Sequence, residues 1–557
     1  MKIVLLAAIV GFGQTPSQPA DRIGAAYEQF LIGHYLESND DVNGAIAAYK
    51  RAMAFDPSAA EIPAELAALY MRQSRAQDAL DAAAQALKID PANREANRVA
   101  GFVYAALGDG LRGANRRPVP GGKPDENLTK AIAHLEKALE RPAGDADPNV
   151  RATLARVYVR TGAYTKAIAL LTDLVNQEPG WQEGPFMLAE AKTRQASALL
   201  QLGTRADAGT ARDLLGEVIA ADPKDAQALY LLSQAERRLG NGEKAEATAR
   251  QVIAQNGRSP WGYYALAETL EDRHEYQTIV DALAPAVADM RPRASSNELL
   301  LLLPHLAFAY QELGQLEKAL PIFEEARKLA PNDVRLARLQ AQALRKSGKI
   351  DQGIGVLQEI IRTRGDDPSA YVALAALYSE ADRGAQAVTL LQEAQKKFPD
   401  DASVVFELGA VFDKQKRYAD AEAAFKQVLA RDPEHAPALN YLGYMLAEHG
   451  VRLDESVDYI KKALAIEPDN GSYLDSLGWA YYKQDKLDLA EENLKKAAAQ
   501  LAGNSVIQEH YGDLLFKRGR YDEAIAAWTK ALAGDGESID RGAIDRKIQS
   551  ARQKIRR

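Results

Sequence analysis

The chain has 557 residues, of which 47% are hydrophobic and 26% are charged, and its formal net charge is -8. This composition is typical of a folded, slightly acidic protein and excludes a disordered or collagen-like chain. The acidic balance gives no general attraction to nucleic acid or to anionic membrane, and the absence of cysteine excludes disulfides, thiolate metal sites and cysteine nucleophiles.

The first predicted element is an export signal with its spacer, at residues 1–20. It has one lysine, an apolar run over residues 3–10, and then small and polar residues. Ten or so apolar residues cannot cross about 30 Å of hydrocarbon, so the pattern favours a secretory signal peptide over a membrane-spanning helix. This interpretation places the protein in the periplasm or outside the cell. The alternative is the first helix of a cytoplasmic protein.

A small residue then recurs along the chain, most often every 34 residues. It occurs at Gly33, Ala67, Gly101, Ala155, Ala189, Ser233, Ala267, Ala307, Ala341, Ala375, Gly409, Gly443, Gly478 and Gly512. An apolar or aromatic residue often follows three positions later, a second small residue twelve positions later, and a proline often ends the unit. Each unit is predicted to be two amphipathic helices that meet at the small residues, and the units must stack to bury their apolar faces.

Several segments carry this pattern in full, among them NYLGYMLAEHG, LDSLGWAYYKQ and EHYGDLLFKRGRYDEAIAAWTKAL. They resemble the tetratricopeptide repeat (TPR), whose signature fixes the offsets of Leu-Gly, Tyr, Ala, aromatic and Pro residues. The resemblance implies an all-α fold: a right-handed α-solenoid of about 14 TPR helix-turn-helix repeats with a C-terminal capping helix. It also implies a protein-binding scaffold, because this family is defined by a scaffold and not by a reaction.

Three interruptions organise the array. A Gly/Pro/Arg-rich loop at 109–126 replaces the turn of repeat three, and about ten extra residues around QLGTRADAGT are expected to lengthen the turn of repeat five. The segment 291–298 breaks the period and predicts a joint between repeats 1–7, at 21–290, and repeats 8–14, at 299–536.

The last predicted element is a capping helix at 537–557, with Ser538 as a candidate N-cap. One face would carry Ile544, Ile548, Ala551 and Ile555, which suits a helix covering the apolar end of the last repeat. The basic residues of the segment are expected mostly on the solvent face. Their alternative role is a contact with an acidic partner or with nucleic acid.

No pattern of catalytic or metal-binding residues meets its requirements. Gly122 and Lys123 lack the spacing and the following Ser/Thr of a phosphate-binding loop, and His274-Glu275 lacks the second histidine of a zinc-protease helix. We therefore expect no enzymatic activity, no metal site and no small-molecule cofactor. A catalytic site hidden in the 109–126 loop is the remaining enzymatic alternative.

In stacked helix pairs the first helices line the concave face, and positions three before, one after and four after the small residue point into the groove. In the last four repeats these offsets predict a partner-binding groove lined by Phe406, Asn440, Tyr444, Asp475, Trp479, Tyr482, Glu509, Asp513 and Phe516. Aromatic rings and an amide suit an extended peptide, and the carboxylates favour a basic partner. Packing alone explains Tyr482, whereas Trp479 fits packing and binding equally well. The N-terminal groove offers a more scattered set: Phe30, His34, Phe102, Tyr230 and Tyr264.

Some members of the family bind chaperone C-termini through a clamp of Lys, Asn, Asn, Lys and Arg. Here Arg98 and Arg338 come nearest to the first clamp position, but Phe102 and Gln342 follow instead of Asn, so such a clamp is not expected.

The chain as a whole resembles exported bacterial repeat proteins that act as adaptors in the cell envelope. Residues 439–497 are similar to the C-terminal part of periplasmic lipoproteins that deliver substrates to carboxyl-terminal processing proteases, although this chain lacks their lipidated cysteine. The predicted function is a non-catalytic scaffold or adaptor that binds an extended peptide or a partner domain in the groove. The alternative is a structural component of an envelope assembly or a polysaccharide-export complex.

Overall fold

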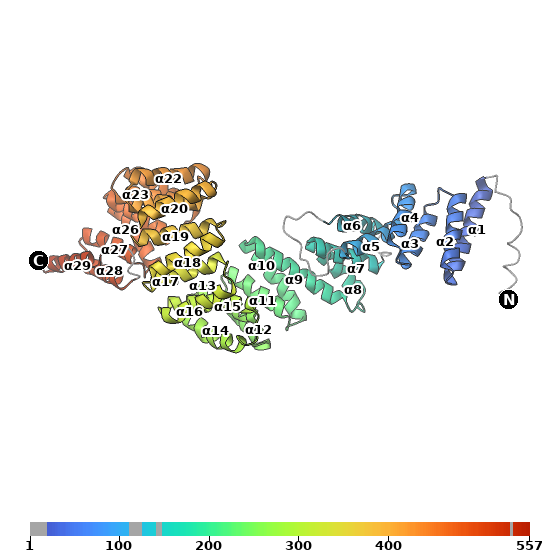
Figure 1. Ribbon diagram of the computed structural model, residues 1–557, viewed down its shortest axis with the longest axis horizontal. Helices are drawn as coiled ribbons and strands as arrows, with labels where there is room; N and C mark the ends of the chain where they lie inside the picture. Colours follow the sequence, from blue (N-terminus) through green and yellow to red (C-terminus); the bar gives the residue numbers. More distant parts are fainter. Residues whose placement is uncertain (1–18, 111–124, 141–146, 535–538, 557) are drawn as a thin grey trace. The chain divides into compact units, whose positions relative to one another are not determined.

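The computed structural model describes residues 19–110, 125–140, 147–534 and 539–556, and these ranges contain 29 α-helices and no strand (Figure 1). The prediction of an all-α solenoid is confirmed. The predicted signal peptide lies almost wholly outside the described residues, since the first helix begins at Pro19. Most of the predicted 109–126 loop lies outside them too. Residues 109–110 end one helix and residue 126 begins the next.

The chain forms two compact units, the first ending at Glu275 and the second beginning at Tyr276. The first unit contains α1 (Pro19–Ser38), α2 (Val42–Phe55), α3 (Glu61–Arg72), α4 (Ala76–Ile89), α5 (Arg94–Gly110), α6 (Glu126–Ala138), α7 (Pro148–Thr161), α8 (Tyr164–Gln177), α9 (Gly184–Leu202), α10 (Arg205–Ala221), α11 (Ala226–Arg238), α12 (Gly242–Gln255) and α13 (Pro260–Asp272).

The second unit contains α14 (Tyr276–Met290), α15 (Ser296–Glu312), α16 (Leu316–Leu329), α17 (Val334–Lys346), α18 (Ile350–Thr363), α19 (Pro368–Glu380), α20 (Gly384–Lys397), α21 (Ala402–Lys414), α22 (Tyr418–Arg431), α23 (Ala436–Glu448), α24 (Leu453–Ile466), α25 (Gly471–Lys483), α26 (Leu487–Gln500), α27 (Ser505–Lys517), α28 (Tyr521–Ala533) and α29 (Arg541–Ile555). Residues 291–295 connect α14 to α15, and the role of this segment as a joint stays a prediction.

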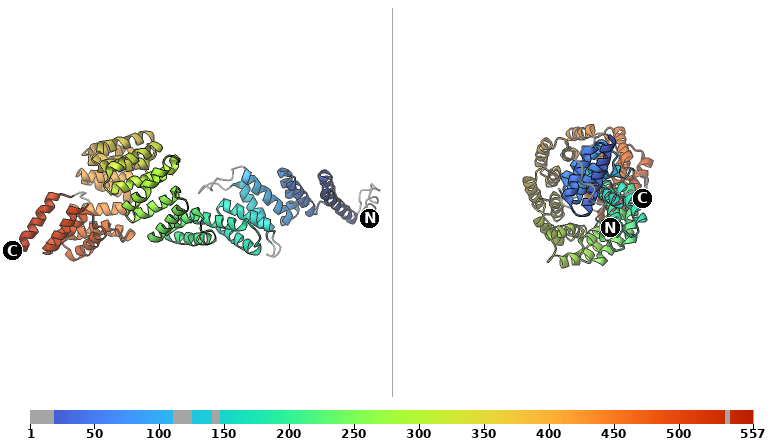
Figure 2. Two further views of the ribbon diagram at one scale, coloured as in Figure 1. Left: turned by 90° about the horizontal axis from the view of Figure 1, so that it is seen from below. Right: turned by 90° about the vertical axis from the view of Figure 1, so that its right-hand side faces the viewer.

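Within each unit the helices pack in chain order (Figures 1 and 2). Alternate helices such as α3 and α5, or α23 and α25, also touch. The recurring small residues lie where the two helices of a repeat meet. A Cβ on Gly478 would lie 2.6 Å from Cγ of Leu494, and one on Gly512 would lie 2.4 Å from Cδ1 of Trp528. Only a residue without a side chain allows these helices to approach so closely.

Repeat five differs from its prediction. Its turn is not lengthened, because only Gly203 and Thr204 separate α9 from α10, and the extra residues extend these two helices to 19 and 17 residues. Gly203 adopts a left-handed backbone with φ 84°, and the Thr204 hydroxyl accepts a hydrogen bond from the Asp207 N–H, so the boundary is capped on both sides. The fully buried small residues of α9 are Ala191 and Ala196 instead of Ala189.

The C-terminal helix α29 packs on α28 and buries Ile544, Ile548 and Ala551 beside Trp528. Two details of its prediction are wrong. Ser538 lies outside the described residues, and the N-cap of α29 is Asp540, whose side chain accepts a hydrogen bond from the Ala543 N–H. Ile555 is 45% exposed, because it lies in the last turn, beyond the buried positions of the helix. Within the part of the chain that the structure describes, no helix is both long and apolar enough to cross a membrane.

Candidate protein-binding sites

A pocket of about 650 Å³ lies in the first unit, between helices α9, α11 and α13. These are the first helices of three consecutive repeats, which is where the concave face of a stacked repeat array is expected. Its lining includes Ser197, Leu200, Gln201, Gln227, Tyr230, Gln234, Arg237, Arg238, Trp261, Tyr264 and Glu268. The pocket thus combines an aromatic side with a polar, charged side.

Three rings form the aromatic side. Trp261 meets Tyr230 edge-on with 5.3 Å between ring centroids, and it meets Tyr264 edge-on at 6.3 Å. Edge-to-face contacts at these separations are the favourable arrangement for aromatic pairs. Trp261 nevertheless remains 48% exposed, so the contacts within the chain cover only half of it.

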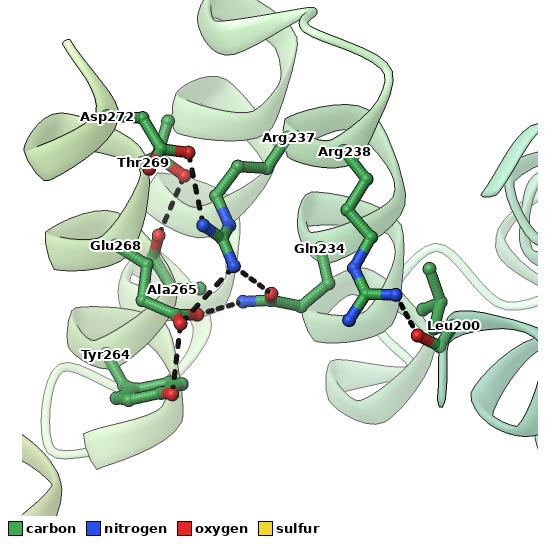
Figure 3. Close-up of polar contacts among 9 residues, drawn as sticks. All are labelled: Leu200, Gln234, Arg237, Arg238, Tyr264, Ala265, Glu268, Thr269 and Asp272. Carbon is green, nitrogen blue, oxygen red and sulfur yellow. Dashed lines mark hydrogen bonds and ion pairs between the residues drawn. The ribbon is translucent and has the colours of Figure 1, made fainter. Parts of the chain in front are cut away.

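The polar side is a hydrogen-bonded network centred on Glu268 (Figure 3). Its carboxylate accepts hydrogen bonds from Gln234 Nε2 at 2.7 Å, from the Tyr264 hydroxyl at 3.1 Å and from Arg237 Nη2 at 3.3 Å. Arg237 also donates to Asp272 at 3.1 Å, and the guanidinium of Arg238 donates to the backbone carbonyl of Leu200. The network holds α11 and α13 together at the pocket and pairs the charge of Arg237 with the carboxylates of Glu268 and Asp272.

Two kinds of hydrogen-bond donor remain at the pocket. Nε of Arg237 is buried and has no acceptor among the described residues. Burial, together with the nearby charge of Glu268, raises the pKa of both Tyr230 and Tyr264 to about 12. Both phenols are protonated at neutral pH, but the Tyr264 hydroxyl already donates to Glu268, so the Tyr230 hydroxyl is the phenol that can donate to a ligand. A ligand that fits this pocket would supply acceptors as well as apolar surface.

The sequence offsets located only part of this pocket. They predict Tyr230 and Tyr264 as groove residues, whereas Gln234, Arg237 and Glu268 are not among the predicted groove residues. The three groove offsets nevertheless apply to these residues. Gln234 and Arg237 lie one and four residues after Ser233, and Glu268 lies one residue after Ala267. Trp261 lies six residues before Ala267, outside the three offsets, so only the structure brings it to the pocket.

The nine residues of the predicted C-terminal groove lie on the inner helices α21, α23, α25 and α27 of the second unit. Asp475 and Trp479 are buried, at 5% and 7% exposure, and the other seven are partly exposed. Their partner-binding role stays a prediction. Their internal contacts decide how much of each side chain is available.

Trp479 is occupied by contacts within the chain. Its ring stacks with His510, at 4.0 Å between centroids, and with Tyr482, at 4.8 Å. Its indole N–H donates to Glu448 Oε2 at 2.6 Å, and the Lys483 ammonium lies 4.8 Å from the ring centroid. Trp479 thus packs in the seam between α25 and α27 with little exposed surface, and its partner-binding role stays a prediction.

The remaining groove residues are also engaged. Asp475 pairs with His510, and Tyr444 lies beside the same imidazole with 6.3 Å between ring centroids. Lys547 of α29 reaches Glu509 and Asp513 at 2.7 Å each, so one basic residue of this helix is not on the solvent face as expected.

Aromatic packing and one unsatisfied acceptor account for the rest of the predicted groove. Phe406 packs on Phe425 and Tyr441, and Phe516 packs on Tyr521 and Trp528. Of the nine predicted groove residues, Asn440 alone has a buried acceptor, its Oδ1, that lacks a donor among the described residues. In the same ranges no group of three or more His, Asp and Glu side chains could hold a metal ion.

Comparison with known proteins agrees with the repeat architecture. Two family models, both described as tetratricopeptide repeat, match the chain, one at residues 306–371, 412–471 and 476–538 and the other at 125–184, 199–269 and 344–410. A TPR repeat-containing protein of Pseudomonas aeruginosa is 41% identical over 76 residues, and one of Methanocaldococcus jannaschii is 34% identical over 83. These alignments cover 14% and 15% of this chain, and only 13% and 14% of the relatives.

The solved structures add a distant likeness. The APC/C hetero-tetramer Cut9–Hcn1 aligns over 96% of this chain and 98% of the compared chain, with 13% identity and a TM-score of 0.36. The family assignment rests on the family models, whose matches together span more than half of the chain. By its sequence and by its paired helices, the protein belongs to the tetratricopeptide-repeat family.

Proposed function

We propose that this protein, a helical-repeat scaffold for protein–protein interaction, binds an extended peptide segment of a partner in the pocket between α9, α11 and α13. A large apolar side chain of the partner lies against Trp261, and its backbone carbonyls accept hydrogen bonds from the pocket. This site lies in the first unit, whereas the sequence predicts a binding groove in the last four repeats.

The exposure of Trp261 carries the proposal. A tryptophan that is 48% exposed beside a pocket of about 650 Å³ leaves a large apolar surface in water. Burying it would contribute roughly 25 cal/mol for each Å² removed from solvent. Tryptophan and tyrosine are also the residue types most enriched among those that dominate protein-binding energy.

The donors of the pocket support a peptide over a purely apolar ligand. A backbone carbonyl could accept a hydrogen bond from the Tyr230 hydroxyl, which lines the pocket, and an extended segment presents one carbonyl per residue. Side chains that alternate along such a segment would reach the aromatic wall.

The proposal is tested by selecting random peptides displayed on phage against the purified full-length chain and then measuring the affinity of the selected peptides. We expect the Trp261→Ala variant to bind them at least about tenfold more weakly, as for the loss of a central aromatic contact. The matched control is Phe186→Ala on α9, because Phe186 is 80% exposed but does not line the pocket. Equal affinities for wild type and Trp261→Ala would contradict the proposal.

The export of the protein is a separate proposal, based on the apolar run near its N-terminus. Residues 1–20 fused to a reporter enzyme that is active only outside the cytoplasm should produce reporter activity in a bacterial host. Full retention of the reporter in the cytoplasm would favour the alternative location.

A further inference from the structure

The second unit has a basic pocket of about 310 Å³ on helices α17 and α19, with one residue from α18. Arg335, Arg338 and Arg345 of α17 line it, and α19 contributes small and aliphatic residues together with Glu380. Glu380 is the only carboxylate in this lining. The pocket is therefore strongly positive in a chain whose net charge is -8.

Two of the three arginines have no counter-charge. Arg345 lies 3.3 Å from the Glu380 carboxylate, whereas Arg335 and Arg338 are exposed and form no ion pair among the described residues. Neighbouring arginines in the same unit are paired, such as Arg327 with Glu359 and Arg383 with Asp351. Like charges one helical turn apart destabilise a helix slightly, so α17 is not optimised for its own stability at this point.

The rest of the lining is apolar except for Gln342. Ala373 and Ala376 of α19 and Leu339 of α17 leave room between the two helices, and no aromatic ring lines the pocket. Nucleic acid recognition on such a surface would need rings on which bases stack. Carboxylates, by contrast, match the two-donor geometry of arginine, and aliphatic side chains match the alanines.

We infer that this pocket binds an acidic segment of a partner protein, with Asp or Glu side chains pairing with Arg335 and Arg338 and an aliphatic side chain lying against Ala373 and Ala376. The site differs from the clamp considered for chain termini, because its charges come from one helix and the Asn positions of that clamp are absent. It also goes beyond the proposed function, since it lies in the other unit and binds acidic side chains, whereas the first pocket binds a large apolar side chain and backbone carbonyls.

The experiment measures the fluorescence anisotropy of a labelled, C-terminally amidated acidic peptide, acetyl-Leu-Asp-Glu-Leu-Glu-Asp-Leu-amide, with the full-length chain. We expect binding that weakens with salt and that falls at least about tenfold in the double variant Arg335→Glu/Arg338→Glu. The matched control is Arg362→Glu/Arg552→Glu, which changes net charge equally at two exposed arginines of the same unit outside the pocket. This control should weaken binding by less than about twofold.

Three further probes make the result decisive. The same peptide with Asn and Gln in place of Asp and Glu should not bind, and equal binding would overturn the inference. The inference would also be overturned if only a peptide with a free terminal carboxylate bound. It would be overturned as well if a single-stranded oligonucleotide, and not the acidic peptide, bound in a way that depends on Arg335 and Arg338. Trp261→Ala should leave binding of the acidic peptide unchanged, so failure of this site and failure of the first pocket can be told apart.

Discussion

His510 and Asp475 form a buried ion pair between consecutive inner helices, with 3.0 Å between Nδ1 and Oδ2 and each side chain 8% exposed. Burial disfavours the charged imidazole, but the charge of Asp475 and the hydrogen bond to it outweigh burial and hold the pKa of His510 above its ordinary value. The pair links α27 to α25 and supports the ring stack of Trp479.

This ion pair predicts a pH dependence of stability. Because the pKa of His510 is higher in the folded protein than in the unfolded chain, its contribution is fully present below about pH 6.5 and is lost as pH rises through the folded pKa. Thermal unfolding followed by circular dichroism should therefore show a melting temperature that falls above this range. Asp475→Asn should lower the free energy of unfolding by about 3 kcal/mol at pH 6 and flatten the dependence. Identical pH profiles for wild type and Asp475→Asn would refute this assignment.

The two tryptophans at groove-forming helices should respond oppositely to truncation. Trp479→Ala removes a buried, hydrogen-bonded ring and should destabilise the second unit by about 3–5 kcal/mol. Trp261→Ala removes a half-exposed ring and should change stability by less than about 1 kcal/mol while weakening peptide binding at least about tenfold. Denaturant titration monitored by circular dichroism, beside the peptide-binding measurement, separates the two roles. A stable Trp479→Ala protein would favour Trp479 as a binding candidate.

The helix pairs could be predicted because the residue that recurs about every 34 positions has to be small. Gly478 and Gly512, for example, lie at close helix contacts that leave no room for a side chain. The availability of groove residues could not be predicted in the same way. An offset gives the direction of a side chain on its own helix, but not whether the next helix covers it. His510 covers Trp479 from the following repeat, whereas none of the described residues covers the outer half of Trp261. The extra residues of repeat five could equally extend a turn or two helices, and local capping by Gly203 and Thr204 decided this.

Lys547 should hold the C-terminal helix in place. Its ammonium lies 2.7 Å from both Glu509 and Asp513, and burial raises the pKa of Asp513 even though Lys547 opposes this shift. Lys547→Met would leave two partly buried carboxylates without this cation, and the free energy of unfolding should fall by about 1–3 kcal/mol. Hydrogen exchange in residues 541–555 should therefore become faster at pH 7. The acceleration should become smaller as the pH is lowered, because protonation of Asp513 relieves the repulsion. Lys554→Met, at an exposed position of the same helix, is the control and should leave exchange unchanged.

Two glycine-to-alanine substitutions in the second unit should have opposite signs. A Cβ on Gly512 would lie 2.4 Å from Cδ1 of Trp528, and this indole is only 1% exposed, so it has no free space into which to move. Gly512→Ala must therefore separate α27 from α28, and we expect a loss of about 1–3 kcal/mol. On α18 a Cβ at Gly355 would meet nothing within 4 Å, and alanine there should gain up to about 1 kcal/mol from its higher helix propensity. Melting temperatures of the two variants test this. If both substitutions stabilised the chain, the close approach of paired helices would not explain why a small residue recurs about every 34 residues.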